Sequence, residues 1–135
     1  MDRYLNQANH NEEFHNCICE NSPDKFYDWK ITSLFYTAIH YLKALALKRD
    51  INIGQTHHEI ELNINPDRNN SSMRITKGAW REYKSLLQYS RTSRYDGIDT
   101  NIETFEIIMK TDYQYCIQHL KNFKKYIKSQ GLEIN

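Results

Sequence analysis

The stretch DWKITSLFYTAIHYLKALAL, from Asp28 to Leu47, constrains the fold more than any other part of the chain. A helix turns by about 100° per residue, so one side of this stretch carries a wide apolar stripe of the kind that packs on a core. The stripe consists of Tyr27, Ile31, Leu34, Phe35, Ala38, Leu42, Leu45 and Ala46. The opposite side, normally charged, carries Trp29, Ser33, Tyr36, His40, Lys43 and Leu47. Such a helix lies between layers of a bundle or offers its second face, with Trp29 and Tyr36, to a partner or ligand.

Size and composition indicate one soluble helical domain over residues 1–135. A chain of 135 residues can bury one substantial core, and ten tyrosines against four glycines and two prolines favour long regular elements over turns. The three cysteines, Cys17, Cys19 and Cys116, form no CxxC pair, so neither a disulfide framework nor a zinc site is indicated. No membrane span or secretory leader is recognisable, which predicts a cytoplasmic protein.

Helical periodicity and turn signals divide the chain into four long helices and one short helix. Thr56 and Glu59 have the spacing of a capping box, which predicts a short helix over His57 to Ile64. Residues 102–109 are compatible with either helix or extended structure. The long helices are expected over about residues 2–20, from Pro23 or Asp24 to Arg49, over 75–91, and over 112–129 before Gly131. The predicted fold is an all-α, up-down bundle of four long helices plus one short helix.

The net charge of +1 hides an acidic N-terminal part and a basic second half. In the helix over residues 75–91, basic side chains share the face opposite the apolar one, and lysines recur at 121, 124, 125 and 128. Regularly spaced cations suit the phosphates of RNA, and nearby tyrosines can stack on unpaired bases. The competing interpretation is a solvated face neutralised by the acidic first helix or by a second subunit. The RNA-binding candidates are Arg74, Lys77, Arg81, Lys84, Arg91 and Tyr95, with Tyr89 nearby.

Three further residues are candidates for chemistry. His40 could act as a general acid or base or be a hydrogen-bonded packing residue, and His57 could approach it across the bundle. Arg94 could grip a phosphate bidentately or neutralise the negative end of its helix. No HExxH, P-loop, dinucleotide or serine-elbow motif is present, so no metal and no cofactor is predicted.

Four segments together resemble the HEPN superfamily, small helical domains of prokaryotic toxin–antitoxin and defence systems. They are DWKITSLFYTAIHY, THHE, YKSLLQYSRTSRY and the final long helix, and the resemblance covers about residues 26–128. It implies a helical bundle, frequently a homodimer, and in active members a metal-independent endoribonuclease that uses the ribose 2′-hydroxyl as nucleophile. Active members carry an Arg-x4–6-His motif. Here the next histidine after Arg94 is His119, whereas Arg3 and His10 have such a spacing on the weakly patterned first helix.

Two functions follow from the residues and the resemblance. The first is a HEPN-like RNA- or nucleotide-binding domain of a defence or toxin–antitoxin system, with endoribonuclease activity an open question. In that case His40 or His57 would transfer protons and Arg94 would stabilise the transition state. The alternative is a non-catalytic interaction module whose Trp29 and Tyr36 face docks a partner toxin or effector subunit. The expected partners are RNA or a nucleotide, a second copy of the chain, and a protein encoded nearby.

Overall fold

The chain folds into a bundle made of helices alone within the residues that the structure describes. The computed structural model describes the backbone of residues 2–95 and 101–135 and the side chains of residues 3–93 and 101–135. The predicted all-α class is therefore confirmed, while the expected Asp96-Gly97 turn and the side chains of Arg94 and Tyr95 lie outside the described residues. The helices are α1 (Asp2–Asn21), α2 (Tyr27–Lys48), α3 (His57–Ile64), α4 (Lys77–Tyr95) and α5 (Ile102–Ser129).

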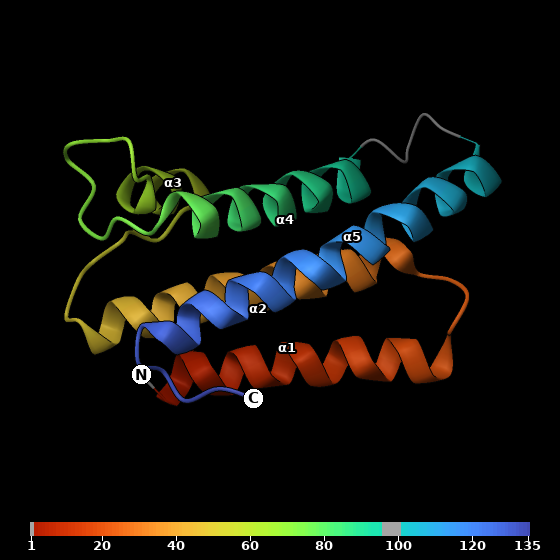
Figure 1. Cartoon of the computed structure of the whole chain (residues 1–135). Helices are drawn as coiled ribbons and strands as arrows, with labels where there is room; N and C mark the ends of the chain where they lie inside the picture. The colour runs from red at the N-terminus through yellow and green to blue at the C-terminus, as the bar shows by residue number, and fades with distance from the viewer. Residues whose placement is uncertain (1, 96–100) are drawn as a thin grey trace.

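The four long helices run alternately up and down, and the short α3 lies beside α4 (Figure 1). The central helix is α2, which packs against α1, α4 and α5, whereas α4 also packs on α5. Helix α1 packs mainly on α2 rather than on α5, although all three are near one another in the lower part of Figure 1. This arrangement leaves a groove between α1 and α5.

The two faces predicted for α2 are both visible in its burial. Every member of the apolar stripe is buried, as the periodicity predicts. The second face is mixed, because Ser33 is buried, Tyr36 and His40 are half-buried, and Trp29 and Leu47 are exposed. Further side chains are buried because α2 is covered from three sides; they are Lys30, Thr32, Thr37, Ile39, Tyr41 and Ala44.

The prediction that the second helix begins at Pro23 or Asp24 is wrong, since α2 begins at Tyr27. Phe26 precedes it in the left-handed region, with φ 60° and no side-chain cap, and this conformation stops the helix from extending further back. The turn is held instead by Lys30, whose buried ammonium donates to the carbonyl oxygens of Ser22 at 2.8 Å and Pro23 at 3.2 Å. At its other end α2 stops at Lys48, one residue before the predicted Arg49.

The short helix predicted from the Thr56 and Glu59 spacing is confirmed, with Thr56 as its N-cap, although the Glu59 carboxylate bonds the Thr56 hydroxyl rather than a backbone amide. The Thr56 hydroxyl oxygen accepts from the Glu59 backbone N–H at 3.1 Å and its hydroxyl lies 3.1 Å from the Glu59 carboxylate. We expect Thr56→Ala to lower the free energy of unfolding by about 1 kcal/mol, because the amide loses its acceptor. Urea unfolding measures this loss. Gln55→Ala, on the neighbouring exposed residue, is the control, and an equal loss in both variants would contradict a capping role for Thr56.

The last helix is longer than the sequence suggests, because α5 begins at Ile102 rather than near Asp112. The side chain of Asn101 caps it by accepting from the backbone N–H groups of Glu103 at 3.0 Å and Thr104 at 3.3 Å. The uncertain segment 102–109 is thus helical. Met109 is buried and Phe105 packs against the core, in line with Tyr113 at intervals of four residues, whereas Ile102, Ile107 and Ile108 are exposed and obscure this core-facing period in the sequence.

Candidate nucleic-acid interface

The basic side chains of α4 lie beside the acidic Glu61 of α3. Glu61 accepts from Lys84 at 3.1 Å and from Arg91 at 3.4 Å, and its side chain is only 19% exposed. Arg81 is exposed on the same helix. One carboxylate therefore contacts two of these three cations but offsets only one positive charge, which supports part of the neutralised-face interpretation and leaves the face positive.

The first two basic residues of this series, Arg74 and Lys77, contact the preceding loop. The Arg74 guanidinium donates to the carbonyl oxygens of Arg68 at 3.0 Å and Asn69 at 2.7 Å, so it fastens the 65–72 loop. Lys77 lies 3.7 Å from Asp67, and both side chains are largely exposed, so this pair contributes little to stability. We call Arg74, Lys77, Arg81, Lys84 and Arg91 the α4 basic face. The five positive charges of this face exceed the two negative charges of Glu61 and Asp67.

An aromatic ring adjoins this face. Lys84, Ser85, Gln88 and Tyr89 line a shallow hollow of about 430 Å³. The Tyr89 ring stacks on His119 of α5, with 6.0 Å between ring centroids and an interplanar angle of 27°. The hollow therefore combines a cation, an amide and a ring edge, which are the groups that bind single-stranded RNA. The side chain of the other candidate tyrosine, Tyr95, lies outside the described residues.

Behind Tyr89 lies a histidine and carboxylate pair that no pattern in the sequence singles out. His119 Nδ1 is 2.6 Å from Glu82 Oε2, and the Asn122 amide donates to the other Glu82 oxygen at 3.3 Å. The three residues join α4 to α5. No local motif could have revealed the pair, because Glu82 and His119 are 37 positions apart.

His40 and His57, the two predicted catalytic histidines, both adjoin Tyr36. His40 Nδ1 is 2.7 Å from the Tyr36 carbonyl oxygen and 3.2 Å from the Asn11 amide nitrogen. Burial lowers the pKa of His40, the hydrogen bond from the His40 ring to the Tyr36 carbonyl oxygen raises it, and the nearby Lys43 lowers it. The His57 ring lies 6.0 Å from the Tyr36 ring and 5.5 Å from the Phe35 ring. A neutral His40 can accept a proton, and its contacts equally suit a packing role.

The expected partner of these histidines, Arg94, belongs to the last turn of α4, and its role stays a prediction because its side chain is not described. Arg3 and His10, which have the motif-like spacing, are both exposed on α1. The Arg3 guanidinium donates to the Tyr4 hydroxyl at 3.0 Å. Among the described side chains, His40 and His57 thus share Tyr36 as a neighbour, His40 through its carbonyl oxygen and His57 through its ring.

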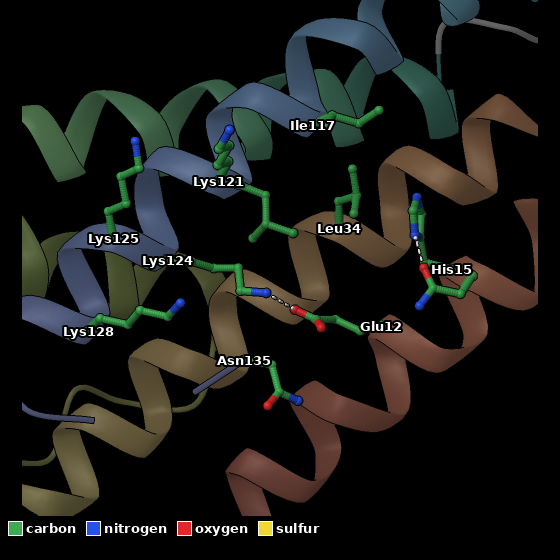
Figure 2. A pocket seen from close by; sticks show the side chains of 11 residues that line it. Glu12, His15, Leu34, Ile117, Lys121, Lys124, Lys125, Lys128 and Asn135 are labelled. Carbon is green, nitrogen blue, oxygen red and sulfur yellow. Dashed lines mark hydrogen bonds and ion pairs between the residues drawn. The ribbon is translucent and has the colours of Figure 1, made fainter. Parts of the chain in front are cut away.

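A second basic surface lies between α1 and α5, and Figure 2 shows it from close by. Four lysines of α5 border a groove of about 370 Å³, which we call the lysine groove. They occupy positions i, i+3, i+4 and i+7, which fall on one side of a helix; the spacing is evident in the sequence, but the facing helix is not. The groove is lined by Lys121, Lys124, Lys125 and Lys128, by Leu34, Ile117 and Leu120, by Glu12, His15 and Asn16 of α1, and by Asn135.

One carboxylate enters the lysine groove. Glu12 accepts from Lys124 at 2.8 Å and from the Tyr41 hydroxyl at 2.9 Å. For the other three lysines no acidic partner occurs among the side chains that the structure describes. On the α1 wall, His15 bonds the Tyr113 hydroxyl at 2.7 Å, and burial lowers the pKa of His15, with a smaller contribution from Lys30. The groove is strongly positive because three of its four lysines have no acidic partner among the described side chains.

The predicted partner face divides into two environments. Trp29 is 56% exposed and lines an apolar hollow of about 330 Å³ with Phe14, Ile18 and Phe26. Tyr36 is half-buried against Phe35, with 5.4 Å between ring centroids. Trp29 is thus available to a partner, whereas Tyr36 contributes mainly to packing around the histidines.

The described part of the chain holds neither a metal-binding cluster nor a membrane-spanning helix. There, no group of three or more His, Cys, Asp or Glu side chains could hold a metal ion, and Cys17, Cys19 and Cys116 are free thiols. Burial raises the pKa of the Cys116 thiol to about 12, which makes it a poor nucleophile. None of the described helices has both the length and the apolar character of a membrane span.

The family relationship follows from a comparison over nearly the whole chain. A family profile described as the HEPN domain matches residues 2–130, an extent that includes all five helices. Comparison with curated proteins gave no match, and comparison with solved structures gave none. The family match extends the resemblance seen in the sequence to α1, and the all-helical fold agrees with it. The chain therefore belongs to the HEPN domain family.

Proposed function

We propose that this HEPN domain binds RNA through the α4 basic face. The observation that carries the proposal is the combination of an excess of cations on α4 with the Tyr89 hollow beside Lys84. Cations on the phosphates supply affinity by releasing counterions, and a half-exposed ring supplies a surface on which a base can stack. A neutralised face would need further acidic groups, and the described neighbours supply only Glu61 and Asp67.

Fluorescence anisotropy with a labelled single-stranded RNA tests the proposal. We expect the affinity to fall steeply as salt rises from about 50 to 200 mM, because each neutralised phosphate of a single strand contributes about 0.7 to the slope of log K against log salt. Affinity that is independent of salt, or no binding at the low salt concentration, would overturn the proposal.

The proposal extends to a role in a prokaryotic defence or toxin–antitoxin system and to metal-independent cleavage of RNA. Cleavage is supported by the position of His40 and His57 around Tyr36 and by the lowered pKa of His40. Incubation with total RNA and tRNA in EDTA, followed by a denaturing gel, should give discrete products that His40→Ala and Arg94→Ala abolish. Intact RNA beside a folded wild-type protein would limit the function to binding.

A second candidate function is a non-catalytic module that docks a partner protein or a second copy of the chain. It is favoured by the exposed Trp29 and its apolar hollow, because contiguous apolar patches mark interaction surfaces. Trp29→Ala should then abolish the complex in analytical ultracentrifugation and leave RNA affinity unchanged. Tyr36→Phe is the control, and a complex that survives Trp29→Ala would exclude this face.

A further inference from the structure

We propose that the hollow beside Trp29 binds a small quaternary ammonium compound, a cation of the choline type. The hollow has a volume of about 330 Å³ and is lined by Phe14, Ile18, Phe26 and Trp29; we call it the Trp29 hollow. It shares no lining residue with the hollow on α4. The inference therefore does not rest on RNA binding by α4, and it names a small ligand where a partner protein is the other possible occupant.

Three of the four lining side chains are aromatic, and they meet at the end of the bundle where a turn joins α1 to α2 (Figure 1). Phe14 is 51% exposed, Phe26 45% and Trp29 56%. No two of these three rings contact each other among the aromatic pairs of the described side chains. Their faces are therefore open to a ligand, and the negative face of an aromatic ring attracts a cation within about 6 Å.

One ring of the Trp29 hollow already carries a cation. Lys25 Nζ lies 5.3 Å from the centroid of the Phe26 ring, which is within the range of a cation–π interaction. Lys25 makes no ion pair with a described side chain. A lysine ammonium is strongly hydrated, whereas the methyl groups of a quaternary ammonium hold water weakly. The quaternary cation therefore loses less hydration on entering an apolar hollow, which makes it the better ligand.

The charge around the Trp29 hollow also favours a cation. Trp29 shares an adjoining hollow of about 160 Å³ with Asp28, and the exposed Glu13, Glu20 and Asp24 belong to α1 and the following turn. None of these four carboxylates forms an ion pair with a described side chain. The negative charge at this end of the bundle is therefore unneutralised and complements a cationic ligand.

The backbone of Phe26 gives a further reason to assign a ligand to this place. Phe26 has φ 60° and ψ 35°, a left-handed conformation that is strained for a bulky side chain and that glycine adopts at no steric cost. Burial does not compensate, because the residue remains 45% exposed. Strained residues concentrate at ligand sites. Phe26→Gly relieves the strain and removes the ring, so this variant should fold and lose affinity for the ligand.

NMR titration with choline, 3,3-dimethylbutan-1-ol and ethanolamine, at constant ionic strength, tests the inference. The alcohol has the shape of choline without its charge, and ethanolamine has the charge without the methyl groups. Choline should bind about tenfold more tightly than either, because the alcohol lacks the cation–π attraction and the primary ammonium is more strongly hydrated. The indole N–H signal of Trp29 should shift. That of Trp80, whose ring already has Lys84 Nζ at 5.4 Å, should not.

Substitutions locate the site, with binding followed by the backbone amide signals around the hollow. Trp29→Leu and Phe26→Gly should each weaken choline binding by about fivefold or more, because each removes a ring. Tyr115→Leu is the matched control, since Tyr115 is as exposed as Trp29 but lies on α5, and it should leave the affinity unchanged. Lys25→Gln should tighten binding a few-fold by freeing the Phe26 ring, and Asp28→Asn should weaken it.

Several results would overturn the inference. If the neutral alcohol binds as tightly as choline, the Trp29 hollow is an apolar docking surface. If tens of millimolar choline leave the Trp29 signal unchanged, or shift Trp80 equally, the rings form no cation site. A trimethyllysine peptide that binds far more tightly than choline would assign the hollow to a modified protein instead of a small compound. Equal losses in Phe26→Gly and Tyr115→Leu would also contradict the location, even if Trp29→Leu fails to fold.

Discussion

Removal of three charges from the α4 basic face, by Arg81→Gln, Lys84→Gln and Arg91→Gln together, is expected to weaken RNA binding by about 100-fold at low salt. The reason is that three phosphate contacts are lost, which should also reduce the slope of log K against log salt by about 2. Anisotropy titrations over a range of salt concentrations measure both quantities.

The matched control removes the same net charge from other helices, by Lys25→Gln, Lys43→Gln and Lys110→Gln. It should change the affinity by only a few-fold through the long-range field of the protein. Equal losses in the two triple variants would show that net charge, rather than the α4 basic face, determines binding. Because the first variant leaves Glu61 without its two cations, thermal unfolding must show that both variants are folded.

Phe35→Ala is expected to have the largest effect on stability, lowering the free energy of unfolding by about 3–5 kcal/mol. Phe35 is fully buried in α2, and its ring centroid lies within 5.8 Å of those of Tyr36, His57 and Tyr83. The variant loses the transfer free energy of the ring and leaves a cavity at the point where α2, α3 and α4 meet. Chemical unfolding followed by circular dichroism measures the loss.

Ile107→Ala is the control for this substitution, since Ile107 is 70% exposed on α5. It should change the free energy of unfolding by no more than about 0.5 kcal/mol. A small loss in Phe35→Ala would contradict a single core centred on α2. It would mean that the helices are held together mainly by their other contacts.

Local sequence signals predicted those parts of the fold that depend on local chemistry. The stripe on α2 is buried as its period requires, and Thr56 and Glu59 placed α3 correctly because an N-cap residue and the amide that it accepts lie within one turn. The start of α2 was missed because Phe26, a residue with no preference for the left-handed region, adopts φ 60°. The start of α5 was missed because the exposed Ile102, Ile107 and Ile108 obscure the core-facing spacing of Phe105, Met109 and Tyr113. Asn101, before Glu103, was a second available signal.

The candidate sites were less predictable, because they are assembled from distant segments. The basic residues of α4 were recognisable, yet their pairing with Glu61 depends on how α3 docks. The lysine row of α5 was visible in the sequence, but a groove exists only because α1 packs mainly on α2 and faces α5 with Glu12 and His15. Trp29 and Tyr36 share a helix face in sequence and separate in the fold, since α3 reaches only Tyr36.

Photocrosslinking of thiouridine-substituted single-stranded RNA, followed by mass spectrometry of the linked peptides, tests the central claim most directly. If RNA lies on the α4 basic face, the crosslinks should occur in the peptide that contains Lys84 and Tyr89 and should disappear in the Arg81, Lys84 and Arg91 triple variant. Crosslinks confined to the peptides of Trp29 or of the lysine groove, with none in α4, would contradict RNA binding on this face.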